Sequence, residues 1–164
     1  MIIWCASYPK SGNTWVRAII TSLIYSENGI FNFDMLRKVS LFPKRFYFKD
    51  FIDDYSDLKK VSQYWIDAQE KINSDGKIKI LKTHNGNYNF LGKDFTNKKN
   101  TLGVIYVVRD PRNIIASISN HYQLNTEQSL NFLFDEKRFL FNENDPNDLT
   151  EENIITLLGS WKAH

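Results

Sequence analysis

A strand, turn and helix pattern at the N-terminus most constrains the fold of this chain. Residues 2–6 form a short apolar run, and the segment "SYPKSG" after it is rich in turn-forming residues; this pattern fits a buried strand followed by a tight turn. Apolar residues then recur at helical spacing, at Val16, Ile19, Ile20, Leu23 and Ile24. We expect a helix there, with Asn13 or Thr14 as its N-cap.

The rest of the chain continues to alternate between element types. Residues 57–74 predict a helix, and residues 77–84 and 101–110 predict strands, of which the second is rich in β-branched and aromatic residues. A helix is expected from Pro111, and a loop over 142–148. This order predicts an α/β, P-loop-like three-layer fold with a mostly parallel central sheet flanked by helices.

Length, charge and cysteine content narrow the class of protein. A chain of 164 residues is enough for one domain, so we expect a single domain over 1–164. A net charge of +2 is too small to indicate a nucleic-acid partner. The single cysteine, Cys5, lies in an apolar run and predicts a buried thiol in a reducing compartment, the cytoplasm. Lys10 interrupts the N-terminal apolar stretch too early for a signal peptide or a membrane span, and we expect no membrane partner.

Polar residues follow each predicted strand at its carboxyl end. "SYPKSGNT" follows the first strand, "KTH" closes the second and "RDPR" closes the third. Ligands of open α/β sheets gather at the carboxyl ends of the strands. If the three strands are parallel neighbours, Lys10, His84 and Arg109 converge on one crevice.

The first of these segments, "YPKSGNTW", has the chemistry of an anion site. A strand, a glycine-containing turn and a helix N-terminus together present backbone N–H groups and the positive end of a helix dipole. Nucleoside-triphosphatases require G-x-x-x-x-G-K-[ST], whereas here Lys10 precedes Gly12. Taken alone, the segment favours an anion site only modestly over a strand-to-helix turn that carries a surface lysine.

The three segments together resemble one family. "YPKSGNTW", "KTH" and "VVRDPRNIIASIS" occur in the order found in sulfotransferases that use 3′-phosphoadenosine 5′-phosphosulfate (PAPS). "LLGSWKAH" at residues 157–164 is similar to the family's G-S-W-x-x-H helix, so the resemblance spans essentially the whole chain.

The resemblance implies a role for each matching residue. It assigns the loop around the 5′-phosphate and sulfonate to Lys10, Ser11, Gly12, Asn13 and Thr14. Trp15 matches the tryptophan beside the adenine, and Arg109 and Ser117, eight residues apart, match the residues that hold the 3′-phosphate. His84 matches the catalytic histidine, and Lys82 lies where a second lysine assists.

Sulfonate transfer to a hydroxyl or amine calls for these residue types. The reaction resembles phosphoryl transfer, in which catalysis is largely positioning and electrostatics, so a lysine and aligned amides suffice without a metal. A histidine with a pKa near ~6.5 suits a general base, the role expected for His84. Lys10 is expected to stabilise the leaving phosphate, and Arg109 offers a planar fork of donors for a phosphate.

Several neighbouring residues have simpler interpretations. Asp110 is expected to cap the helix from Pro111. Ser119 does not fit the family spacing that selects Ser117, and His121 and His164 gain no support from the pattern. Core packing is the expected role of three tryptophans, Trp4, Trp65 and Trp161.

The chain departs from the family at its far end. The family's glycine-rich G-x-x-G-x-x-K segment, which covers the adenosine and 3′-phosphate, has no counterpart here, and "GSWKAH" carries no helix stop signal. We therefore expect a C-terminally truncated member; the alternative is a shortened member that lacks one wall of its cofactor site.

The acceptor and the competing functions stay open at this point. The phenylalanine-rich residues 28–56 lie where the family recognises acceptors, but core packing explains them equally well. A small-molecule or carbohydrate acceptor is expected, and the oligomeric state is unknown. The alternatives are a P-loop nucleotide kinase or other nucleoside-triphosphate enzyme with magnesium, and a noncatalytic nucleotide-binding module.

Overall fold

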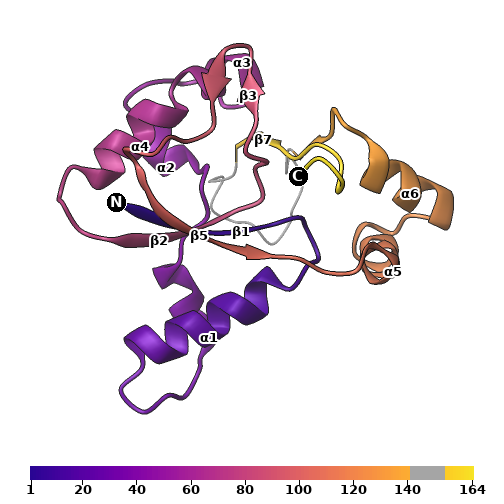
Figure 1. Cartoon of the computed structure of the whole chain (residues 1–164), viewed down its shortest axis with the longest axis horizontal. Helices are drawn as coiled ribbons and strands as arrows, with labels where there is room; N and C mark the ends of the chain where they lie inside the picture. Colours follow the sequence, from indigo (N-terminus) through magenta and orange to yellow (C-terminus); the bar gives the residue numbers. More distant parts are fainter. Residues whose placement is uncertain (141–153) are drawn as a thin grey trace.

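A parallel sheet of three strands forms the centre of the protein (Figure 1). The computed structural model describes residues 1–140 and 154–164. The strands are β1 (Ile2–Ser7), β2 (Lys79–Thr83) and β5 (Thr101–Val107), and their order in the sheet is β2-β1-β5. Both pairings of β1 are parallel. The predicted α/β fold with a parallel sheet flanked by helices is confirmed.

Helix α1 (Asn13–Tyr25) follows β1, but it starts differently from the prediction. Its N-cap is Gly12, in the left-handed conformation with φ 101°, and no side chain caps it. The prediction of Asn13 or Thr14 as N-cap is therefore wrong. The Asn13 side chain is buried and donates instead to the Cys5 carbonyl at 3.0 Å and to Ser7 Oγ at 3.1 Å. These two bonds of Nδ2 hold the Asn13 side chain at the end of β1 and away from the helix start.

The helix predicted over 57–74 is two helices in the structure. Helix α3 (Leu58–Gln63) is capped by Asp57, whose side chain accepts from the Lys59 amide, and helix α4 (Trp65–Asn73) follows it. They are separated at Tyr64, which has φ −111° and ψ 11°. The Tyr64 ring stacks on Phe51, whereas Trp65 is fully buried. The break between the helices therefore lets these two consecutive aromatic side chains occupy different environments.

Helix α5 (Pro111–Tyr122) begins where it was predicted. The Asp110 side chain accepts from the Arg112 amide, which confirms Asp110 as the cap. Helix α6 (Thr126–Phe134), which the sequence analysis did not predict, packs against α5. It starts with a capping box in which Asn125 and Gln128 bond each other's backbone amides. The spacing of Asn125 and Gln128 in the sequence could therefore have predicted the start of this helix.

Short elements complete the described chain. They are η1 (Phe33–Lys38), α2 (Arg45–Phe48), β3 (Asn89–Phe90), β4 (Lys93–Asp94), β6 (Phe139–Leu140) and β7 (Thr156–Leu157). Strands β6 and β7 pair antiparallel and attach the C-terminal segment to the chain after α6. Residues 161–163 form a turn instead of the expected helix, with the His164 amide donating to the Ser160 carbonyl. The loop expected over 142–148 lies outside the described residues.

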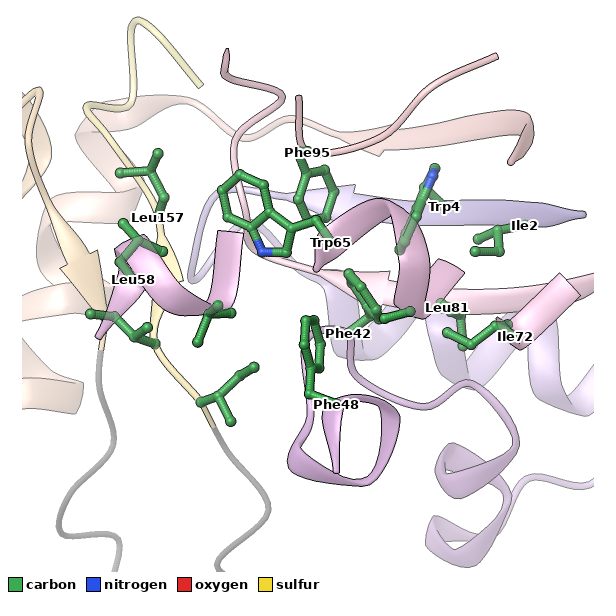
Figure 2. Packing of buried hydrophobic residues seen from close by; sticks show 14 of the residues in the cluster. Ile2, Trp4, Phe42, Phe48, Leu58, Trp65, Ile72, Leu81, Phe95 and Leu157 are labelled. Carbon is green, nitrogen blue, oxygen red and sulfur yellow. The ribbon is translucent and has the colours of Figure 1, made fainter. Parts of the chain in front are cut away.

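Aromatic side chains form the main core on one side of the sheet (Figure 2). The rings of Trp4, Phe48 and Phe95 lie around Phe42 with centroid distances of 5.5–5.9 Å. Trp65 is also buried there, whereas Trp161 is half-buried against a second cluster built around Tyr8, Ile114, Ile118, Phe132, Leu133 and Leu158. Part of the phenylalanine-rich stretch therefore serves core packing, and the buried thiol predicted at Cys5 is confirmed.

Other apolar side chains face outward. On α1, Ile19 is 58% and Leu23 78% exposed, although their helical spacing is typical of a buried face. On β5, the strand at one edge of the sheet, Leu102 and Val104 are at least half exposed. Among the described residues, the helices are too short or too polar to cross a membrane.

We predict that Phe42→Ala destabilises the protein by about 3–5 kcal/mol, since it opens a cavity among packed rings. Urea unfolding of both proteins measures the difference. Phe46→Ala is the matched control, because Phe46 is 63% exposed, and it should cost less than about 1 kcal/mol. Equal losses in the two variants would contradict the placement of the core.

Candidate functional site

The three strand ends open into one cavity of about 810 Å³. Among its lining residues are Pro9, Lys10, Gly12, Asn13, Thr14 and Trp15 from the first loop, Lys82 and His84 from the end of β2, and Arg109 and Ser117 from the β5–α5 unit. The structure thus brings together Lys10, His84 and Arg109, as the parallel arrangement required. The volume lies in the range of ~300–1,000 Å³ typical of small-ligand pockets.

The loop between β1 and α1 is turned by two residues with positive φ, Lys10 at 66° and Gly12 at 101°. Glycine adopts this conformation without steric cost, whereas a lysine in it is strained. The Asn13 amide fixes the turn to the end of β1 through its bonds to Cys5 and Ser7. The loop is therefore held so that the N-terminus of a 13-residue helix faces the cavity.

Ser11 lies inside this turn and does not line the cavity. It is 6% exposed, and its Oγ has no hydrogen-bond partner among the described residues. Buried hydroxyls nearly always have a partner, so this atom is an unmet hydrogen-bonding group within the loop. Thr14 and Trp15 are exposed at the cavity rim, with Trp15 at 78%.

Arg109 joins the end of β5 to the first loop. Its Nη1 donates to the Lys10 carbonyl at 3.1 Å, which uses one of the five N–H donors of the guanidinium. Ser117 is half-buried on α5 and lines the same cavity. This side of the cavity can therefore take a second anionic group, separate from the one at the helix start.

Two residues close in sequence to Arg109 and Ser117 have partners outside the cavity. Ser119 Oγ lies 2.7 Å from Ser129 Oγ on α6, and Arg112 Nη2 forms an ion pair with Asp110 at 2.6 Å. Neither Ser119 nor Arg112 is among the described residues that line the cavity. Of these four residues, only Arg109 and Ser117 line the cavity.

His84 has a defined tautomer. Its Nδ1 lies 2.7 Å from the Ser7 carbonyl, which only accepts, so Nδ1 carries the proton and Nε2 is the basic nitrogen. Burial, followed by the positive charge of Lys82, lowers the pKa of His84 to about 3. The imidazole is therefore neutral at physiological pH, with its lone pair on Nε2.

Lys82 is half-buried among other cations. Burial first, and then the charge of Arg17, lowers the pKa of Lys82 to about 8, and Lys10 and Lys44 act in the same direction. Like charges held this closely repel one another, and an anion in the cavity would relieve the repulsion. Electrostatics and shape therefore both indicate an anionic ligand.

Sequence reasoning missed other residues that line the cavity. They are Leu41, His121, Tyr122, Leu140, Ile154 and Thr156. His121 lies four residues after Ser117 on α5, so helical spacing alone could have found it. Leu41 reaches the site through an isolated parallel bridge to Lys82, which no local pattern signals.

Arg17 is a further missed residue. It donates to the carbonyls of Leu36 and Val39 at 2.6 and 2.7 Å and so ties α1 to the η1 segment. Its charge also reaches the site, since it is the largest electrostatic cause of the lowered pKa of Lys82.

Comparison with protein families matches residues 2–164 to the family described as Sulfotransferase domain. A search of curated proteins found no match. The family match covers the described residues from Ile2 onward, including all of the residues that line the cavity.

We predict that the His84 ring stays neutral, with its proton on Nδ1, as the pH falls from 8 through 6.5. Imidazole ¹⁵N NMR against pH measures both properties, because the two nitrogens of a neutral ring have different shifts. In Lys82→Met the apparent pKa of His84 should rise, since a cationic neighbour is removed. A wild-type titration midpoint near 6.5 would contradict the lowering of the pKa by burial and Lys82. A neutral ring with its proton on Nε2 would contradict the Ser7 contact.

Proposed function

The chain belongs to the sulfotransferase domain family, and from this premise we propose that it transfers a sulfonate group from PAPS to a hydroxyl or amine acceptor. The observation that carries the proposal is the single cavity that joins a helix N-terminus, a basic histidine nitrogen and an arginine–serine pair. We also propose that residues 1–164 act as one domain.

The residues fit a nucleotide with two anionic ends. The α1 N-terminus with Lys10 and Lys82 suits the 5′-phosphosulfate, since backbone amides and cations stabilise such groups. Arg109 and Ser117 suit the 3′-phosphate, and the exposed ring of Trp15 suits an adenine. Ser11 offers its unmatched hydroxyl within the loop. When bound, PAPS supplies the activated sulfonate.

His84 is the proposed general base. Its Nε2 is the unprotonated nitrogen, and it belongs to a ring that lines the cavity, so it can take the proton from an acceptor hydroxyl. Lys10 is proposed to stabilise negative charge on the leaving phosphate, with Lys82 beside His84 as the assisting cation. The acceptor is proposed to be a small molecule or a carbohydrate.

A nucleoside-triphosphate enzyme is the alternative from another class. Such enzymes hold magnesium with carboxylates and a Ser or Thr after the P-loop lysine. The G-K-[ST] element is absent from the first loop, and the cavity lining within residues 1–140 and 154–164 includes no Asp or Glu. Both features favour an anionic donor held by cations and amides. A noncatalytic nucleotide-binding module is the remaining alternative.

We predict that Arg109→Ala weakens binding of 3′,5′-bisphosphoadenosine roughly 10- to 100-fold, the loss expected for a charge-assisted hydrogen bond to phosphate. Isothermal titration calorimetry measures the affinity. Arg112→Ala is the matched control, because Arg112 is paired with Asp110 outside the cavity, and it should change affinity less than about threefold. Tighter binding of ATP with magnesium than of the bisphosphate would overturn the proposal.

We predict that His84→Ala lowers the rate of sulfonate transfer by roughly 10²- to 10⁴-fold, the usual contribution of a general base. The affinity for the bisphosphate should stay within a few-fold, since the ring is not assigned to the donor. A transfer assay at saturating donor and the calorimetric titration together separate the two effects. Bisphosphate binding by the wild-type chain without any transfer would instead support the binding module.

A further inference from the structure

His164 contacts the backbone of His84. Its Nε2 is 3.1 Å from the His84 carbonyl oxygen, and its Nδ1 is 2.8 Å from the Tyr106 hydroxyl. The His164 ring stacks on the Tyr106 ring at 22° and meets the Tyr8 ring edge-on at 84°. His164 therefore connects β5, the end of β1 and the residue proposed as the base.

These contacts fix the tautomer of His164. The His84 carbonyl only accepts, so Nε2 of His164 carries the proton and donates. Nδ1 is then an acceptor, and the Tyr106 hydroxyl donates to it. Burial lowers the pKa of His164, which favours the neutral form of the ring. The Tyr106 hydroxyl thus reinforces the tautomer in which His164 Nε2–H donates to His84.

The same C-terminal segment holds the residues that follow His84. The Leu157 amide donates to Asn85 Oδ1 at 2.8 Å, and the Gly86 amide donates to the Leu157 carbonyl at 2.9 Å. The chain then turns at Gly159, where φ is +67° and a Cβ would meet the Tyr88 hydroxyl at 2.2 Å. The turn leads to His164, so the segment contacts residues 85 and 86 through Leu157 and residue 84 through His164.

We infer that His164 is a positioning residue for His84. Its Nε2–H, which is oriented by Tyr106, holds the His84 backbone. The His84 ring thereby keeps its Nδ1 hydrogen bond to the Ser7 carbonyl, and its Nε2 stays available to accept a proton. His84 is then anchored at two points, at its backbone carbonyl by His164 and at its ring Nδ1 by Ser7. The effect on catalysis rests on the function proposed above, whereas the effect on the His84 ring does not.

Two variants of His164 separate the hydrogen bond from simple packing. Glutamine places its amide nitrogen close to the position of the histidine Nε2 and keeps a donor, whereas leucine fills similar space without one. We predict that His164→Leu lowers the transfer rate roughly 10- to 100-fold through misplacement of the base. His164→Gln should stay within about threefold of wild type, and both variants should keep their affinity for 3′,5′-bisphosphoadenosine.

Imidazole ¹⁵N NMR gives a readout that does not depend on transfer. His84 should show the Nδ1–H tautomer in the wild type and in His164→Gln, and a mixture of tautomers in His164→Leu. An unchanged His84 spectrum in His164→Leu, or equal losses in both variants, would overturn the inference. If the wild-type chain transfers no sulfonate, the NMR comparison alone decides, and only the proposed function fails.

Tyr106→Phe is the second variant, for the case in which His164→Leu does not fold. It keeps the ring stack and removes the hydroxyl that orients His164. We expect a mixture of tautomers at His164, with a thermal midpoint close to that of the wild type. A His164 spectrum that stays purely in the Nε2–H form would contradict the role given to Tyr106.

Discussion

The parallel pairing of β1 with both of its neighbours is the constraint on which the site depends. Ala6 pairs with Thr83 on β2 and with Tyr106 on β5, so three chain segments leave the sheet at the same edge. Ser7, the last residue of β1, accepts two hydrogen bonds at this edge. Its carbonyl accepts from His84 Nδ1, and its hydroxyl accepts from the Asn13 side-chain amide. One residue therefore fixes both the proposed base and the anion loop.

The site is arranged at some cost to the folded chain. Lys82 is partly buried among cations, His84 is desolvated, and Lys10 has a strained left-handed backbone. Each of these features is unfavourable in isolation. An anion bound at the helix start would offset the repulsion between the cations and supply partners for unmatched donors. Such preorganisation is expected where a protein binds a charged ligand, since the unfavourable free energy of arranging the site is part of folding and does not weaken binding.

Local signals predicted the strands, the Asp110 cap and the convergence of Lys10, His84 and Arg109, because each signal lies within a few residues of sequence. The break at Tyr64 was not predictable in this way, since it depends on a ring contact with Phe51 and on burial of Trp65. The apolar periodicity predicted the helix α1 but not the surroundings of its apolar face, where Ile19 and Leu23 are exposed. Lining residues such as Leu41 and Thr156 come from distant segments, and only the tertiary fold places them.

The low pKa of His84 links the two halves of the proposed reaction. A ring with a pKa of about 3 is a weak base, so on its own it would hold an acceptor's proton poorly. A negative charge in the same cavity favours the imidazolium form and raises that pKa. Because Ser7 holds both the anion loop and His84, an anion bound at that loop would lie close to the His84 ring. In the proposed reaction, a bound anionic donor would therefore make His84 a stronger base, which would join proton removal to the presence of the group to be transferred.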